Sequence, residues 1–298
     1  MTALSEWRAA GTVIDFGGHR IFYRQHGRLT PGARVLVCIH GFPTASWDWH
    51  RLWPALIETF DVVIAPDMLG FGFSDKPRGH RYTIQEQCDL HEHLLSSLGI
   101  TETTVLAHDY GDTVAQEWLA RLIDGSAVVR PRAIALLNGG LFPETHRARL
   151  VQKLLASPVG PWLAVAMGKA SFARSLCAVF GAKTQPSQTD LDAFWALASR
   201  DGGKAAMARL IHYMAERRSQ RARWVGALQE SPIPIRVIDG LDDPVSGAHM
   251  VERYRALVAQ PDVMELPGIG HYPQVEAPEQ VLDALRDWPP FLAGGARA

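Results

Sequence analysis

One segment of the sequence combines a reactive side chain with the spacing that would expose it. At 104–111 an apolar run, TVLA, leads into HDYG, and a helical pattern follows from Thr113. Ala107 and Gly111, two positions before and after Asp109, are small enough for a sharp strand-to-helix turn, which lifts its central side chain above a sheet. The pattern therefore predicts a nucleophile elbow with Asp109 at its tip, although aspartate at such a junction is also an ordinary N-cap.

Two later segments supply an acid and a base. The turn DGLDDPV follows an apolar run and carries Asp243, with its neighbour Asp242 as the alternative acid, and GIGHYP carries His271 after the last apolar run. The order nucleophile, acid, base recurs among hydrolases whose nucleophile lies on such an elbow. We predict a triad in which Asp109 is the nucleophile, His271 the general base and Asp243 the group that orients the imidazole.

A loop earlier in the chain could stabilise a negatively charged oxygen. HGFP follows the apolar run VLVCI, and the N–H of Phe42 would join that of Tyr110, the residue after the nucleophile, in an oxyanion hole. Polar and aromatic side chains near these motifs are expected to line a substrate pocket: His40, Trp47, His108, Asn138 and His146.

A carboxylate nucleophile restricts the reaction. Attack on a carboxylic ester would give an anhydride, whereas attack on a saturated carbon that bears a leaving group gives a stable alkyl ester on Asp109. Water would then attack the carbonyl carbon of that ester, with His271 as base. The predicted reaction is cleavage of a carbon–oxygen or carbon–halogen bond.

The elements that must position these groups alternate along the chain. Apolar runs without alternation, separated by helical patterns such as 84–98 and 113–122, predict a parallel sheet covered on both faces. The expected strands are 13–16 and 21–23, which form a hairpin, and then 35–39, 62–65, 104–107, 133–137, 235–238 and 263–266. No strand is expected between 141 and 231, so we predict a helical cap there, inserted into a core of residues 1–140 and 232–298.

Motifs along most of the chain resemble one protein family. They include HGFPT at 40–44, GFGFSDKP at 70–77, HDYGD at 108–112, NGG at 138–140, FPETHR at 142–147, RWVGAL at 223–228, DPV at 243–245 and HYPQ at 271–274. Over about residues 11–290 the chain resembles the α/β-hydrolase branch that holds epoxide hydrolases and haloalkane dehalogenases. The resemblance implies an α/β-hydrolase fold, with a mostly parallel central sheet, helices on both faces and an inserted helical cap, and it supports the triad.

The leaving group separates the two reactions of that branch. Epoxide hydrolases of the family generally protonate the leaving oxygen with two cap tyrosines; the cap here holds one, Tyr213, and His212 or His146 could substitute for the second. Family dehalogenases typically place Trp after the nucleophile and commonly Asn after HG, where this chain has Tyr110 and Phe42. Trp47, Trp49 or a cap tryptophan could compensate. We therefore rank hydrolysis of an epoxide to a diol above dehalogenation, with a non-catalytic ligand-binding protein as a further alternative.

Composition limits the partners. Thirty Lys and Arg against 31 Asp and Glu give a net charge of −1 over 298 residues, which argues against nucleic acid. The basic run at 217–223 is interpreted as a solvated helix face. We expect no cofactor and no metal, because His91 and His93 are two apart and point to different helix faces. The expected partners are a small apolar substrate, an epoxide or a haloalkane, and water, while the oligomeric state stays open.

Location follows from what the sequence lacks. The cysteines Cys38, Cys88 and Cys177 form no CxxC pair, and the first residues carry no apolar stretch of the secretory type. The longest uncharged apolar stretch, 154–168, is too short to span a bilayer and contains two prolines. A cytoplasmic protein without a membrane span is the expectation.

Overall fold

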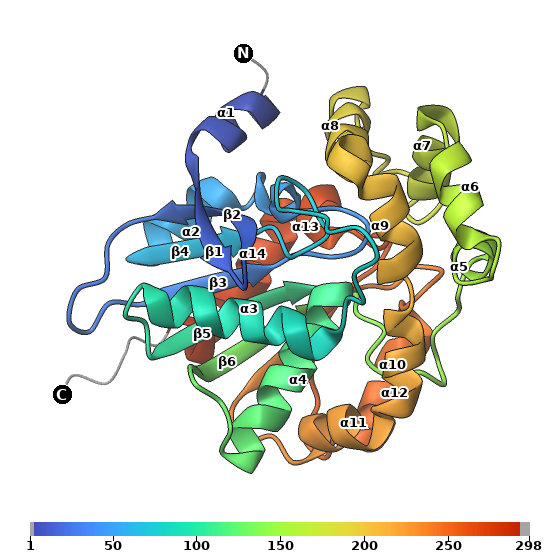
Figure 1. Ribbon diagram of the computed structural model, residues 1–298. Helices are drawn as coiled ribbons and strands as arrows, with labels where there is room; N and C mark the ends of the chain where they lie inside the picture. The colour runs from blue at the N-terminus through green and yellow to red at the C-terminus, as the bar shows by residue number, and fades with distance from the viewer. Residues whose placement is uncertain (1–2, 293–298) are drawn as a thin grey trace.

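The computed structural model describes residues 3–292, and its centre is an eight-stranded sheet (Figure 1). The strands lie in the order β1-β2-β4-β3-β5-β6-β7-β8. Their bounds are β1 Gly11–Phe16, β2 His19–His26, β3 Val35–Ile39, β4 Val62–Pro66, β5 Glu102–His108, β6 Arg130–Leu137, β7 Ile235–Gly240 and β8 Asp262–Leu266. The pairs β1–β2 and β2–β4 are antiparallel and the other five are parallel, so the predicted, mostly parallel sheet is confirmed.

Helices cover both faces of this sheet. In Figure 1, α3 and α4 lie in front of the strands and α14 lies behind them. The helices of the core are α1 Ala3–Ala9, α2 Trp53–Thr59, α3 Ile84–Ser97, α4 Tyr110–Asp124, α12 Ala248–Leu257, α13 Pro273–Glu276, α14 Pro278–Arg286 and α15 Pro289–Leu292, with the 3-10 turn η1 at Ser46–Trp49. Because β3 and β4 are covered on both sides, every residue in them is buried, which explains their uninterrupted apolar sequence.

Local signals fix the ends of the helices beside the site. Thr83 caps α3 by accepting a hydrogen bond from the N–H of Glu86, and the left-handed Gly125 ends α4. Helix α4 starts at Tyr110, three residues before the helical pattern that the sequence shows, because its first turn is the elbow itself. The hairpin strands are likewise longer than their apolar runs.

Between β6 and β7 the chain forms helices and no strand. They are α5 Leu150–Leu155, α6 Gly160–Ala166, α7 Lys169–Cys177, α8 Gln188–Ser199, the 3-10 turn η2 Arg200–Gly202, α9 Gly203–Leu210, α10 Tyr213–Ser219 and α11 Arg221–Gln229. Helices α5 to α9 gather on one side of the sheet, at the right of Figure 1, and α11 packs on α4. We propose that 141–231 acts as a cap on the core formed by 1–140 and 232–298.

Within the described part of the chain, no helix combines the length and the apolar character that crossing a bilayer requires.

Candidate active site

Asp109 lies at the turn between β5 and α4, where its backbone is strained. Its φ of 48° and ψ of −103° place a non-glycine residue in a sparsely populated conformation, of the kind that clusters at functional sites. A Cβ on Gly111 would lie 2.4 Å from the carbonyl oxygen of Ile39, so α4 can start this close to β3 only because residue 111 is glycine. The turn therefore has the geometry of the predicted elbow.

The carboxylate of Asp109 faces the loop that follows β3. Its Oδ2 accepts a hydrogen bond of 3.1 Å from the N–H of Phe42, one of the two predicted oxyanion donors. In the described chain the N–H of Tyr110, the other predicted donor, makes no hydrogen bond to this carboxylate. Oδ2 therefore lies where a backbone N–H can stabilise a negatively charged oxygen.

His40 holds this loop in shape. Its Nδ1 lies 2.8 Å from the carbonyl oxygen of Gly41, and its Nε2 accepts a hydrogen bond of 3.0 Å from the N–H of Met68. Since a carbonyl oxygen can only accept, Nδ1 carries the proton. Burial lowers the pKa of His40, which favours the neutral ring that this pattern needs. His40 is fully buried and shapes the loop without lining a cavity.

His271 connects the carboxylates of Asp109 and Asp243. Its Nδ1 lies 2.7 Å from Oδ2 of Asp243, and its Nε2 lies 3.9 Å from Oδ2 of Asp109. Oδ2 of Asp243 also accepts hydrogen bonds from Ser246 and from the side-chain amide of Asn138. The alternative acid, Asp242, is exposed and accepts instead from the N–H of Gly268. The geometry thus favours Asp243 as the partner of the imidazole.

The buried charges of the site stabilise one another. Burial alone would raise the pKa of Asp109, but the neighbouring His271 and Arg217 outweigh it and hold that pKa below its usual range. Burial alone would lower the pKa of His271, but Asp243 and Asp109 raise it well above the ordinary value. These contacts favour the ionised form of Asp109 and the protonated form of His271.

A small cavity of about 90 Å³ lies over this triad. Asp109 and His271 reach it from the core, and the cap side is mostly apolar. The other lining residues are Phe42, Pro43, Val245 and Tyr272 from the core and Arg149, Val151, Gln152, Leu155, Met167, Phe172, Ser175, Leu176, Val179 and Met207 from the cap segment. A largely apolar space on which a carboxylate and an imidazole converge fits a small apolar substrate.

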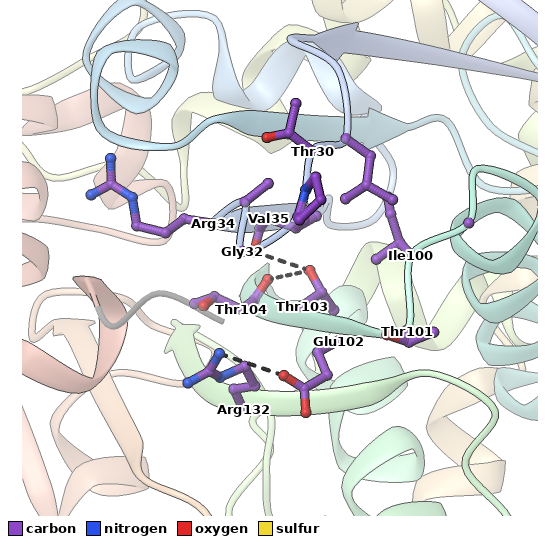
Figure 2. Close-up of a pocket in the computed structure, with 14 residues that line it drawn as sticks. Thr30, Gly32, Arg34, Val35, Ile100, Thr101, Glu102, Thr103, Thr104 and Arg132 are labelled. Atoms are coloured by element: carbon purple, nitrogen blue, oxygen red, sulfur yellow. Dashed lines mark hydrogen bonds and ion pairs between the residues drawn. The ribbon is translucent and has the colours of Figure 1, made fainter. Parts of the chain in front are cut away.

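A wider pocket, shown in Figure 2, lies far from this chemistry. It measures about 410 Å³ and is formed where β3, β5 and β6 begin, at Val35, Glu102 and Arg132. The carboxyl ends of parallel strands, not their beginnings, are where α/β folds bind ligands. This pocket holds an ion pair of 3.5 Å between Glu102 and Arg132 and no further reactive group. Within residues 3–292 no cluster of His, Cys, Asp or Glu is suited to hold a metal ion.

Four other predicted pocket residues do not line this cavity. His108 donates from Nε2 to the carbonyl oxygen of His271 at 2.8 Å, so it positions the backbone of the base. Asn138 holds Asp243 from the end of β6, with a φ of 45°. Trp47 stacks on His50 at 4.1 Å, and His146 opens into a separate pocket beside Arg217.

Tyr213 lies beside the turn that carries Asp109. It is 1% exposed at the start of α10, its ring is 4.9 Å from that of Tyr110, and its hydroxyl has no hydrogen-bond partner in the described chain. Burial raises the pKa of Tyr213, and the charge of Asp109 raises it further, so the phenol keeps its proton. An unpartnered buried hydroxyl is costly unless something else uses it, such as a bound substrate.

Arg217 is a site residue that sequence reasoning missed. The basic run was expected to be solvated, but Arg217 is 3% exposed, so the expectation is wrong there. Its Nη2 donates to the backbone carbonyl of Asp109 at 3.0 Å and lies 3.7 Å from Oδ1, and its Nε donates to Oγ1 of Thr113 at 2.7 Å. Its guanidinium also lies 4.5 Å from the centre of the Tyr213 ring. Only the fold reveals which arginine of the run turns inward.

Comparisons with known proteins agree with this architecture. Residues 36–284 match the alpha/beta hydrolase family, and the chain belongs to it. The chain is 42% identical over 289 residues to the mesoderm-specific transcript homolog protein of Bos taurus, an alignment that covers 95% of this chain and 86% of that protein.

Solved structures share the fold as well. The epoxide hydrolase CorEH is 20% identical with a TM-score of 0.77, and the match covers 94% of this chain and 98% of that one. A loop variant of the haloalkane dehalogenase DbeA from Bradyrhizobium elkanii is 21% identical with a TM-score of 0.77, covering 95% and 97%. The two likenesses are equally close, so the reaction has to be argued from the site.

Proposed function

We propose that this protein is a cofactor-free hydrolase that opens epoxides through an ester on Asp109. The observation that carries the proposal is the arrangement at the cavity. The Asp109 carboxylate sits on a strained elbow with one oxygen on the N–H of Phe42, 3.9 Å from an imidazole that is bonded to Asp243. A buried, ionised carboxylate facing a mostly apolar space is suited to attack a saturated carbon.

In the first step an oxygen of Asp109 attacks a ring carbon, and the carbon–oxygen bond of the epoxide breaks. The electron pair stays on the departing oxygen, which takes the proton of the Tyr213 hydroxyl. The phenolate left on Tyr213 faces the guanidinium of Arg217, which lowers the pKa of the phenol against the larger rise caused by burial. A single tyrosine assisted by an arginine would thereby do the work that the family gives to two tyrosines.

In the second step water hydrolyses the ester. Alkylation removes the negative charge of Asp109, so the pKa of His271 falls and the imidazole can act as base. His271 takes a proton from water, which attacks the ester carbonyl carbon while the oxyanion rests on the N–H of Phe42. Collapse of that intermediate expels the second diol oxygen, which takes the proton held by His271. The other proton of the water, left on the carboxyl of Asp109, returns to the Tyr213 phenolate through solvent, so the carboxylate and the phenol are both restored.

Dehalogenation ranks second because the cavity lacks suitable donors. A leaving halide is held by side-chain N–H groups of the Trp and Asn type, and neither residue type lines the cavity within the described chain. Tyr213 is not among the residues that line the cavity either, but its unpartnered hydroxyl is an O–H donor, which a leaving oxygen needs and a halide does not.

Repeated turnover in ¹⁸O-labelled water tests the proposal. Because water attacks the ester carbonyl, one oxygen of the Asp109 carboxylate exchanges in each cycle, and the peptide that contains Asp109 should gain the label. Diol formation without label in that peptide would contradict the ester. Halide release from bromoalkanes without diol from epoxides would favour the dehalogenase, and saturable binding without product, unchanged in Asp109→Asn, would favour a binding protein.

A further inference from the structure

The cap presents an apolar outer surface, here called the cap patch. Six of the ten large apolar side chains that are exposed in the described chain fall within 150–165: Leu150, Leu154, Val159, Trp162, Leu163 and Val165. Trp162 is 80% exposed. All of them except Val159, which directly precedes α6, lie on α5 and α6, at the outer edge of the molecule at the right of Figure 1. Clustered exposure of this kind marks a site of interaction.

Helix α6 lacks the polar face of an ordinary surface helix. Its sequence GPWLAVA contains no polar side chain, and only Gly160 and Ala164 are buried, where the helix packs against α9. A helix that borders water normally carries polar residues on its outer side. The larger side chains of α6 face outward and the smaller ones inward, which suits an apolar environment outside the cap.

The segment that carries the cap patch is strongly basic. Residues 145–189 contain six Lys and Arg and no Asp or Glu, a net charge of +6 in a chain of net charge −1, so the remainder carries −1 − 6 = −7. Lys153, Arg174 and Lys183 are exposed and form no ion pair in the described chain, whereas Lys169 pairs with Asp192. The partner that this segment attracts is therefore negatively charged as well as apolar.

We propose that the cap patch docks on an anionic lipid bilayer. Trp162 and its apolar neighbours would enter the boundary between headgroups and acyl chains, and the basic residues of the segment would contact the lipid phosphates. Helix α5 would then separate lipid from the catalytic cavity, since Val151, Gln152 and Leu155 line that cavity while Leu150 and Leu154 face outward. A protein partner would need acidic and apolar side chains placed to match this surface, whereas an anionic bilayer offers negative headgroups and apolar acyl chains over its whole surface.

Vesicle sedimentation tests the proposal with the full chain. Vesicles of phosphatidylcholine mixed with phosphatidylglycerol should bind the protein, vesicles of phosphatidylcholine alone should bind it several-fold more weakly, and salt should weaken the difference. Trp162→Ser combined with Val165→Ser should lower binding about tenfold, because an aromatic anchor is lost. Val128→Ser is the matched control: that valine is 67% exposed outside the segment and should leave binding unchanged.

Failure to bind anionic vesicles would overturn the proposal, and so would binding that Trp162→Ser and Val165→Ser leave intact. A dimer of the native chain that those substitutions dissolve, without vesicle binding, would show that the surface joins two copies and would also overturn it. Asp109→Asn should bind vesicles as the native chain does. The outcome is therefore independent of the reaction proposed above.

Discussion

At the scale of single residues, the site works by balancing buried charges. Asp109 and Asp243 are negative, and His271 and Arg217 lie against them. Breaking one of these contacts leaves an unpaired charge in a buried site, which is far more costly than at a surface. In the proposed reaction, the formation of an ester on Asp109 would remove one charge and would therefore change the pKa of His271.

The two steps should therefore depend on pH differently. His271 has a pKa raised by two carboxylates, and alkylation of Asp109 removes one of them. Hydrolysis of the ester should accelerate as pH rises through the pKa of His271 in the alkylated enzyme. Formation of the ester should not slow as pH falls through about 3.9, the ordinary value for aspartate, because the pKa of Asp109 lies lower. Rapid-quench measurement of each step checks this, and identical pH profiles would contradict it.

Removal of the Tyr213 hydroxyl should slow only the first step. Tyr213→Phe should reduce the rate of epoxide alkylation about 100-fold, in the range of a lost general acid, and leave ester hydrolysis nearly unchanged. Tyr254→Phe is the control, since Tyr254 is equally buried but lies on α12 beside Phe142. Equal loss in the two steps, or equal loss in the two variants, would show that Tyr213 has a packing role.

The sequence predicted candidate residues that adjoin strand ends, together with Tyr213 from the cap segment, but it did not single out Arg217 on the same helix. Asp109, Asp243 and His271 each follow an apolar run, and parallel strands bring such positions to one edge of a sheet. Arg217 lies on the seven-residue helix α10, too short to show which face is buried. The prediction that His40 and His108 line the pocket rests only on their closeness to the motifs in the sequence. In the structure their rings bind backbone carbonyl oxygens instead, that of Gly41 and that of His271.

At the scale of elements, the elbow depends on the close approach of α4 to β3. The sequence predicts the strands at 35–39 and 62–66 because full burial makes them wholly apolar. It does not predict the start of α4, because the first turn of that helix consists of elbow residues. The outward-facing apolar residues of α6 were visible in the sequence only as a stretch too short to span a membrane. Their exposure depends on how the cap helices pack, which periodicity does not reveal.

Gly111→Ala should destabilise the elbow. The new methyl group would clash with the backbone of β3, which cannot move without disturbing the sheet. We therefore expect a loss of about 1–3 kcal/mol in the free energy of unfolding, with a fall in activity. Gly226→Ala on α11 is the control: no atom lies within 4 Å of the added group, so alanine should stabilise by about 0.5–1 kcal/mol. Urea unfolding measures both, and a neutral Gly111→Ala would contradict the packing argument.

At the scale of the whole molecule, polar contacts join the cap segment to the core. Glu144, just after β6, pairs with Arg221 of α11 and Arg253 of α12, and Trp224 donates from its indole to Glu117 of α4. Arg221, in the later part of the basic run, therefore ties α11 to Glu144, whereas Arg217 contacts Asp109. We propose that the cap is held to the core at this end, so that it covers the cavity while its apolar outer edge presents the cap patch.

Acid should weaken the Glu144 contact. Hydrogen bonds with Arg221 lower the pKa of Glu144 to about 2, below its ordinary value. The contact therefore stabilises the folded chain at pH values above the pKa of Glu144 in the unfolded chain, and this stabilisation is lost as the pH falls toward 2. The pair is largely exposed, so the effect should be small. Glu144→Gln should flatten the fall in melting temperature over this range of pH, and an unchanged slope would contradict the assignment.

Trapping the ester tests the central claim most directly. In His271→Gln the carboxylate of Asp109 can still attack, but no base activates water, so incubation with an epoxide should add the mass of one substrate molecule to the protein, localised to Asp109 by peptide mapping. Asp109→Asn combined with His271→Gln should gain nothing. A folded His271→Gln enzyme that stays at its native mass, while the native enzyme turns over the same epoxide, would show that Asp109 is not the nucleophile.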